Sequence, residues 1–231
     1  MKTPTLGMPL RRIVPALIAS IGTLGLFTLA GCEGSSDSNN VVTGGLPTGQ
    51  ATQAQVQQGR ALVLSGGCTD CHNRGLDDPS SPNWLAGHIA GSQSSMFQIG
   101  PFTTYAANLT PDIATGLGSK TDRQVYNALK FGLDPADTPD VVITSTTPGQ
   151  GNFPTTPHYL APPMPWPSFR HFSDSDLWSI VAYLKHGIKP VANAVPDSQG
   201  PPDFWASSYT PDKIGPLVEP AFPTANEQFA P

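Results

Sequence analysis

The sequence is poor in charge and in cysteine. Charged residues make up 13% of the 231 residues, against ~25% in an average soluble protein. The formal charge is −5 and no long basic patch is present, which disfavours nucleic acid as a partner. The chain has three cysteines, Cys32, Cys68 and Cys71. It therefore has no second cysteine pair to complete a structural zinc site of four ligands.

Proline and glycine are abundant instead. The 26 prolines and 23 glycines together exceed a fifth of the chain, which predicts extensive loops around a small core. Residues 73–107 and 133–170 lack a strong hydrophobic period. Loops of this length are uncommon in a compact domain unless they are functional or wrap around something.

The N-terminal residues 1–31 have the composition of a secretory signal peptide. Lys2, Arg11 and Arg12 precede the apolar run "IVPALIASIGTLGLFTLAG", as such signals require. The run leads into "LAGC", which resembles the lipobox of bacterial lipoproteins and predicts that Cys32 is lipidated as the mature N-terminus. The alternative is an uncleaved transmembrane anchor, because about 18 apolar residues can just span a bilayer. Both interpretations place the rest of the chain on the periplasmic or cell-surface side of a bacterial membrane.

The region that follows the signal divides into three parts. Residues 32–50 are rich in Ser, Asn, Gly and Thr and are predicted to be a flexible linker. We expect the folded domain to span 51–190 and a proline-rich extension to span 191–231. Without 1–31, which holds three basic and no acidic residues, the formal charge becomes −8. An acidic surface suits long-range attraction of a basic partner.

The proline-rich extension also carries large aromatic side chains. They are Phe204, Trp205, Tyr209 and Phe222. Segments that remain disordered are usually poor in aromatic residues. We therefore expect the extension to dock on the domain or on a partner.

Three segments carry helix signals, and each begins with a capping residue. Thr52 and Thr121 are each followed three positions later by a glutamine, which is the capping-box pattern. Ser173 is followed in the same way by an aspartate, a looser form of that pattern. Gly132 lies where a helix C-terminal glycine belongs. The third segment, 173–185, also has apolar residues at i, i+3, i+4 and i+7 and is predicted to be a helix.

The sequence "GGCTDCHNRG" at 66–75 raises four chemical possibilities: zinc, a redox dithiol, a disulfide and covalent haem. Zinc lacks further ligand pairs, and a thioredoxin-like dithiol needs a βαβ context that the sequence does not show. A disulfide between Cys68 and Cys71 would close a very small loop and stabilise little. Cys-x-x-Cys-His is the attachment signature of haem c. It predicts that the two thiols bind the haem covalently and that His72 is the proximal iron ligand.

A second axial ligand is predicted at Met164. It lies in "APPMPWP", where prolines on both sides restrict the backbone and remove amide donors. A methionine ligand raises the reduction potential of haem iron and favours electron transfer. The alternative is that Met164 only fills an apolar patch. Met96 lacks such flanking residues, and His158 is the second candidate for the distal ligand.

Together these segments resemble the class I c-type cytochromes. "GGCTDCH", "PPMPWPSF" and "FSDSDLWSIVAYLKHGIKPV", with "NLTPDIATGLG" at 108–118, are similar to the mono- and dihaem cytochromes c associated with membrane-bound dehydrogenases. The resemblance covers about 55–191. It implies a mostly α-helical cytochrome c fold, with three to five helices around one covalent haem, long loops and the proline-rich extension. One Cys-x-x-Cys-His motif occurs, so a monohaem member is expected.

The resemblance also implies roles for residues outside the ligand set. "SPNWLAG" at 81–87 is similar to a stretch whose proline carbonyl accepts a hydrogen bond from the proximal histidine, which predicts this role for Pro82. The first and last helices are expected to cross at Gly59, near Trp178 and Tyr183. "NLTPD" is expected to be a turn below the haem edge. Trp166 is expected to pack either on the haem or in the ordinary core.

The sequence therefore predicts a membrane-tethered electron carrier rather than an enzyme. Its partners would be redox proteins, namely a dehydrogenase, an oxidase or a reductase. The first alternative is a haem-based sensor or small-ligand binder with a labile sixth ligand. The second is a peroxidase, which needs a vacant distal site with acid and base residues that the sequence does not show.

Overall fold

The computed structural model describes residues 51–201, 203, 205–218, 220–222, 224 and 227. The predicted signal peptide, the lipidation site Cys32 and the linker lie outside these described residues. All of the described residues belong to one unit, Val41–Pro231. Among them, no helix combines the length and the apolar character needed to span a membrane.

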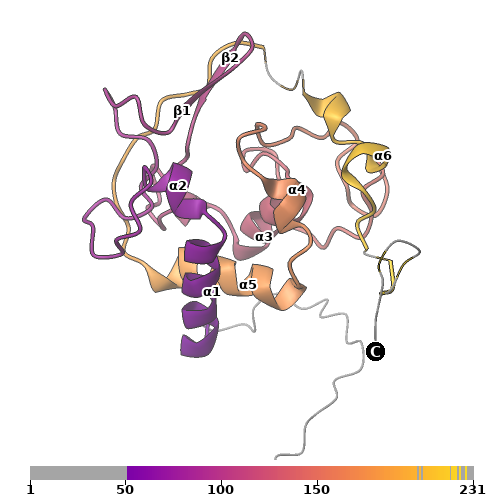
Figure 1. Ribbon diagram of the computed structural model, residues 1–231, viewed down its shortest axis with the longest axis horizontal. Coiled ribbons are helices and arrows are strands. Elements are labelled where there is room, and N and C mark those ends of the chain that lie inside the picture. The colour runs from indigo at the N-terminus through magenta and orange to yellow at the C-terminus, as the bar shows by residue number, and fades with distance from the viewer. Residues whose placement is uncertain are drawn as a thin grey trace, which may run out of the picture. The chain divides into compact units, whose positions relative to one another are not determined.

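Helices are the main regular elements (Figure 1). In chain order the elements are α1 (Gln53–Ser65), α2 (Cys68–His72), β1 (Met96–Ile99), β2 (Phe102–Tyr105), the 3₁₀ helix η1 (Leu117–Ser119), α3 (Asp122–Phe131), α4 (Trp166–Phe169), α5 (Asp174–Ala182), the π-helical η2 (Tyr183–Gly187), the 3₁₀ helix η3 (Ala206–Ser208) and α6 (Pro211–Ile214). The mostly helical class is confirmed, and the arrangement is compatible with a cytochrome c fold.

The predicted helix starts are confirmed by their caps. Thr52 and Thr121 each accept a hydrogen bond from the backbone of the glutamine three residues later, and that glutamine side chain accepts from the cap backbone. The Ser173 hydroxyl accepts from the backbone amide of Asp176. Gly132 ends α3 in the left-handed conformation at φ +68°. Local sequence therefore sets the beginnings of these three helices and the end of α3.

Helix α1 crosses α5 at Gly59, near Tyr183, as predicted. A Cβ atom on Gly59 would lie 1.8 Å from the carbonyl oxygen of Ser179 and 2.8 Å from Cβ of Tyr183. The two helices can approach this closely because glycine has no side chain. Helix α5 then continues directly into the π-helical η2, so that the predicted helix widens in its last turn.

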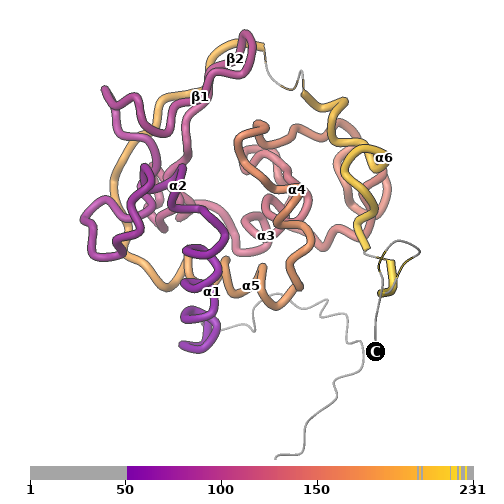
Figure 2. Tube along the Cα trace, in the orientation of Figure 1, coloured from indigo at the N-terminus to yellow at the C-terminus, as the bar shows by residue number. Residues whose placement is uncertain are grey.

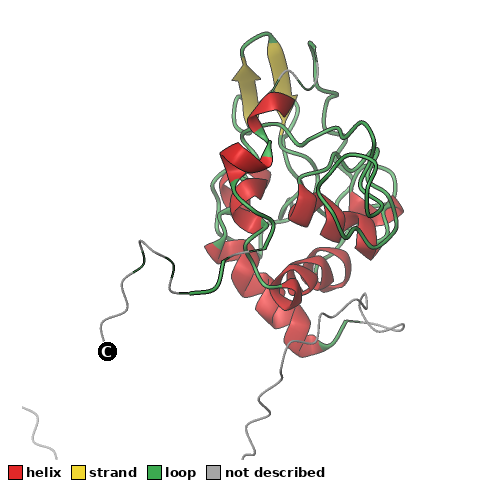
Figure 3. Ribbon diagram, turned by 90° about the vertical axis from the view of Figure 1, so that its right-hand side faces the viewer, coloured by secondary structure: helices red, strands yellow, loops and turns green. Residues whose placement is uncertain are grey.

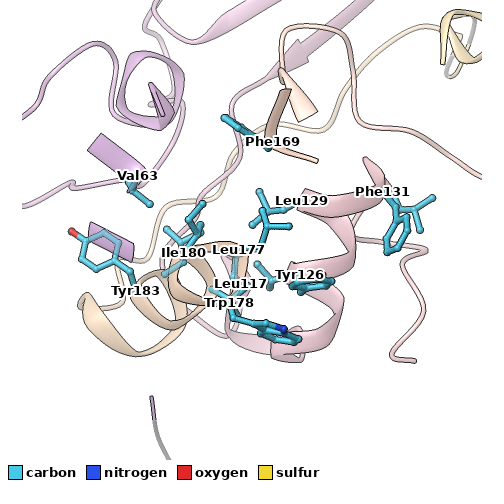
Figure 4. Close-up of a cluster of buried hydrophobic side chains, with 14 of the residues drawn as sticks. Val63, Leu117, Tyr126, Leu129, Phe131, Phe169, Leu177, Trp178, Ile180 and Tyr183 are labelled. Carbon is cyan, nitrogen blue, oxygen red and sulfur yellow. The ribbon is translucent and has the colours of Figure 1, made fainter. Parts of the chain in front are cut away.

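The main core lies where α1, α3 and α5 meet (Figure 4). Leu177 and Val181 of α5 are fully buried. Tyr126 of α3 stacks on Trp178 with ring centroids 4.4 Å apart. Burying such side chains contributes roughly 1.5–3 kcal/mol each. The contact between α3 and α5 forms one side of the cavity described below.

A short hairpin interrupts the region predicted to lack regular structure. Strands β1 and β2 are antiparallel, with Met96 opposite Tyr105 and Ile99 opposite Phe102. Figure 3 shows them as a yellow pair beyond the helices. Four-residue strands carry too few alternations to register as a hydrophobic period.

The extension docks on the domain. Its trace passes along the hairpin before it reaches α6 (Figure 2), and Gln199 exchanges two backbone hydrogen bonds of 2.8 Å with Thr103. Trp205 is buried against Phe102, with ring centroids 4.8 Å apart. Tyr209 packs edge-on against Trp166 at 4.9 Å. The expected docking is confirmed for Trp205 and Tyr209.

Candidate haem site

An apolar cavity lies between α2, α3 and the segment that carries Met164. Its empty volume is about 1270 Å³, which includes space open to solvent. The walls are mostly aliphatic and aromatic side chains, and Lys120 is the charged residue among those that line the cavity. The described lining residues that carry candidate ligands are Cys68, Cys71, His72 and Met164. The fold therefore brings both predicted halves of the site to one cavity.

Helix α2 directs both cysteine side chains to this cavity. Gly67, at φ +71°, precedes the helix, and the spacing of three residues places Cys68 and Cys71 on one face. Both are free thiols. Burial raises the pKa of Cys68 to about 11 and also raises the pKa of Cys71. Both shifts are opposite to the lowered pKa that reactive dithiols need, which disfavours the redox-dithiol alternative.

The His72 ring is oriented by a backbone carbonyl. The Nδ1–H group donates to the carbonyl oxygen of Ala107 at 2.7 Å. This bond leaves Nε2 as the unprotonated nitrogen of the neutral ring, and Nε2 has no hydrogen-bond partner among the described residues. Burial lowers the pKa of His72. A neutral, oriented imidazole is the form that binds iron.

The prediction for Pro82 is wrong. Pro82 is exposed, and the carbonyl that accepts from the His72 ring belongs to Ala107. The segment around Pro82 reaches His72 elsewhere, because the Gly87 amide donates to the His72 backbone carbonyl at 2.9 Å. The extra residue in "SPNWLAG" accompanies this change. No side-chain pattern identifies a backbone carbonyl as the acceptor, so sequence reasoning missed Ala107.

Met164 lies in the cavity wall between two prolines that also line it. The Met164 amide donates to the carbonyl of Ala161, and the Trp166 amide donates to the carbonyl of Met164, both at 2.9 Å. Met96 is exposed on β1 and is not among the lining residues. His158 is also exposed and pairs with Asp203. Of the three candidates for the distal ligand, Met164 is the one that lines the cavity.

Trp166 lies behind the cavity rather than in its wall. It stacks on Tyr159 with ring centroids 5.8 Å apart and interplanar angle 3°, and it covers the left-handed Gly132. Of the two packing roles expected for Trp166, the structure therefore shows the ordinary core role. "NLTPD" at 108–112 is irregular with a bend at Thr110, and the turn itself follows at 113–115; Asn108 and Thr110 are buried.

The residues present fit a covalent haem. The thiols of Cys68 and Cys71 lie on one face of α2, and the His72 imidazole is oriented by the Ala107 carbonyl. The thioether of Met164 lies in the same apolar cavity. In the part of the chain that the structure describes, no three His, Cys, Asp or Glu residues gather as a metal-binding cluster. This set of side chains fits the attachment and ligation of a haem c.

Comparison with known proteins agrees with that interpretation. No family model matches the chain. The chain is 30% identical over 171 residues, 71% of its length, to the gluconate 2-dehydrogenase cytochrome c subunit of Pantoea cypripedii, of which 32% is covered. It is 32% identical over 70% of its length to the alcohol dehydrogenase (quinone) cytochrome c subunit of Komagataeibacter europaeus, of which 27% is covered. It is 29% identical over 67% of its length to the fructose dehydrogenase cytochrome subunit of Gluconobacter japonicus, of which 26% is covered.

The chain is therefore related to the cytochrome c subunits of dehydrogenases, as its motifs predicted. It spans about a third or less of the length of these relatives. Each of the three is named as a cytochrome subunit of a dehydrogenase.

Proposed function

We propose that this protein is a monohaem c-type cytochrome that carries single electrons between redox proteins outside the cytoplasm. The observation that carries the proposal is the meeting of Cys68, Cys71, His72 and Met164 in one apolar cavity. These residues come from two segments more than 90 positions apart in the sequence. Ordinary core packing has no need to bring two thiols, a neutral imidazole and a thioether together.

Each residue has a defined task at this site. Cys68 and Cys71 would form thioether bonds, His72 would supply Nε2 to the iron, and Met164 would supply its sulfur. A haem c held in this way supplies a one-electron couple at iron. The residues around it exclude water and keep the ligands in place. Ala107 and the prolines on either side of Met164 serve this purpose, because fixed ligands reduce reorganisation during electron transfer.

The class of partner follows from the relatives and from the charge. The relatives are cytochrome subunits of gluconate, alcohol and fructose dehydrogenases, so we propose a dehydrogenase as electron donor. An oxidase or a reductase would take the electron onward. The formal charge of −8 without residues 1–31 favours docking on basic surfaces.

We also propose that a lipid on Cys32 tethers the domain to a membrane through the linker 32–50. The observation is the signal-like segment that leads into "LAGC". Cys32→Ser should release the haem-loaded domain into the soluble fraction. Continued membrane association of the processed variant would overturn the lipid anchor and leave the haem site unaffected.

The central test uses the protein expressed together with a haem c attachment system. We expect one covalent haem per chain, a methionine–iron charge-transfer band in the ferric state and slow carbon monoxide binding in the ferrous state. Rapid carbon monoxide binding without the charge-transfer band would favour the haem-sensor alternative instead. Absence of covalent haem would overturn the proposed function.

A further inference from the structure

The beginning of the C-terminal extension lies against the two residues that hold His72. We call residues 191–193 the clasp. The two contacts on His72 are the Ala107 carbonyl, which accepts from the ring, and the Gly87 amide, which donates to the backbone carbonyl. Both Ala107 and Gly87 are flanked by groups that hydrogen-bond to the clasp.

On the Gly87 side, the contact is made by the Asn193 side chain. Its Nδ2 donates to the carbonyl of Ala86 at 2.7 Å and to the carbonyl of His88 at 2.8 Å. These carbonyls belong to the residues immediately before and after Gly87. One amide group therefore bridges the peptide whose N–H binds the His72 carbonyl. A side chain that satisfies two carbonyls in this way limits how that peptide can rotate.

On the Ala107 side, the contact is made by Asn108. Asn108 is 3% exposed, and its Nδ2 donates to the carbonyl of Val191 at 2.8 Å. Its Oδ1 accepts from the backbone and the hydroxyl of Thr110 at 3.0 and 2.8 Å. The Val191 amide returns a bond of 3.1 Å to the Thr110 hydroxyl. The peptide that carries the Ala107 carbonyl is thus tied to the clasp at its next residue.

The segment around Gly87 and the segment around Ala107 also contact each other, and they do so at Gly87. A Cβ atom there would lie 2.4 Å from the carbonyl oxygen of Ala106 and 2.5 Å from that of Ala107. The His88 amide donates to the Ala106 carbonyl at 2.9 Å. Residues 86–88 and 106–108 therefore form one close-packed support behind His72, and the clasp bonds to both of its segments.

We propose that Asn193 is a positioning residue for the proximal ligand, acting through this support. The inference rests on the proposed function, since it concerns how strongly the His72 Nδ1–H group bonds to Ala107. A stronger bond makes an imidazole ligand more basic and stabilises ferric iron. Loosening the clasp weakens that bond, so the extension sets part of the reduction potential although it contributes no ligand.

The test is Asn193→Ala in the haem-loaded protein, with Asn127→Ala as the matched control. Asn127 is fully buried, whereas Asn193 is half-buried, and Asn127 likewise donates Nδ2 to two carbonyls, those of Pro139 and Val141, each at 2.9 Å. Its contacts lie on the 138–141 loop and not on the support of His72. The control therefore loses the same kind of hydrogen bonds at another site.

We expect Asn193→Ala to raise the reduction potential, changing the equilibrium constant with a one-electron mediator by about threefold or more. The His72 Nδ1 proton should exchange with solvent about tenfold faster. Asn127→Ala should change neither quantity. Wild-type values in Asn193→Ala, or equal changes in both variants, would overturn the inference.

A second measurement keeps the inference testable if Asn193→Ala does not accumulate. Thr115→Val removes the hydroxyl that accepts from the Asn193 backbone amide at 3.0 Å and leaves the Asn193 side chain in place. The Gly87 amide should then exchange faster with solvent, and this can be followed with or without haem. Unchanged exchange of Gly87 would overturn the clasp, whereas missing covalent haem would overturn the proposed function alone.

Discussion

The two sides of the candidate site are built differently. The His72 side is buried and held by hydrogen bonds from three separate parts of the chain, including the clasp. The Met164 side is half-buried and is held by two flanking prolines and local backbone bonds. One side is fixed by long-range contacts and the other by the stiffness of its own segment. We therefore expect substitutions on the His72 side and on the Met164 side to change different properties of the protein.

The largest effect is expected at the covalent attachment points. Changing both Cys68 and Cys71 to alanine should abolish covalent haem, because no other described cysteine lines the cavity. Haem staining after denaturing electrophoresis measures this directly. Cys32→Ser is the control and should keep full staining. Staining that persists in the double variant would contradict the attachment assignment.

The next largest effect is expected at Gly87 on the His72 side. Gly87→Ala combines φ +77° with a Cβ atom 2.4 Å from the Ala106 carbonyl oxygen, so we expect a loss of about 3 kcal/mol or more in the free energy of unfolding. Gly75 has φ +75° and open space around it. Gly75→Ala should therefore cost only about 1 kcal/mol. Denaturant unfolding compares the two, and equal losses would show that the close approach is unimportant.

Met164→Ala should leave the covalent attachment of haem intact and lower the reduction potential. Haem should remain covalently bound, while the potential falls by about 59 mV or more, a tenfold change for one electron. Met96→Ala is the control, since Met96 is exposed on β1 and does not line the cavity. Redox titration measures both variants. A potential that stays the same in Met164→Ala would remove Met164 from the ligand set.

The smallest effect is expected from a change of pH that titrates the pair of His158 and Asp203. This pair joins the loop before Met164 to the extension. Hydrogen bonding to Asp203 raises the pKa of His158 above its usual value near 6.5. A raised pKa means that the stabilisation is complete below the unfolded value and is lost as pH rises through the folded one. The unfolding midpoint in urea should fall slightly between pH 5.5 and 8.5, and His158→Gln should remove that difference. An unchanged difference would assign the pH dependence to other groups.

The residues that could be predicted from sequence are those whose signal is local. Thr52, Thr121 and Ser173 mark helix starts because a cap needs only its own neighbours. The Cys68–His72 spacing is likewise contained in five residues. Gly59 was predictable because the family resemblance supplies the helix crossing. Met164 could be proposed because prolines stiffen its own segment.

The features that could not be predicted depend on backbone atoms or distant pairing. Ala107 acts through its carbonyl, which every residue type possesses. Strands β1 and β2 are too short to show alternation. The two amide contacts of Asn193 join segments more than a hundred residues apart, and an asparagine in a proline-rich extension gives no sign of such a role. Pro82 was assigned by resemblance, whereas in the structure it is exposed and the His72 ring donates to the Ala107 carbonyl.

The docked extension also has a consequence for the order in which the chain folds. The Asn193 contacts close loops of 107 and 105 residues, and such non-local contacts form late because loop closure must come first. Helix α2 and the capped helices depend on nearby residues and can form early. We therefore expect a folding interval in which both thiols are displayed on α2 while the support behind His72 is still open. Covalent attachment in that interval would precede the closing of the clasp, so that the last contacts to form are those that set the final strength of the His72 hydrogen bond.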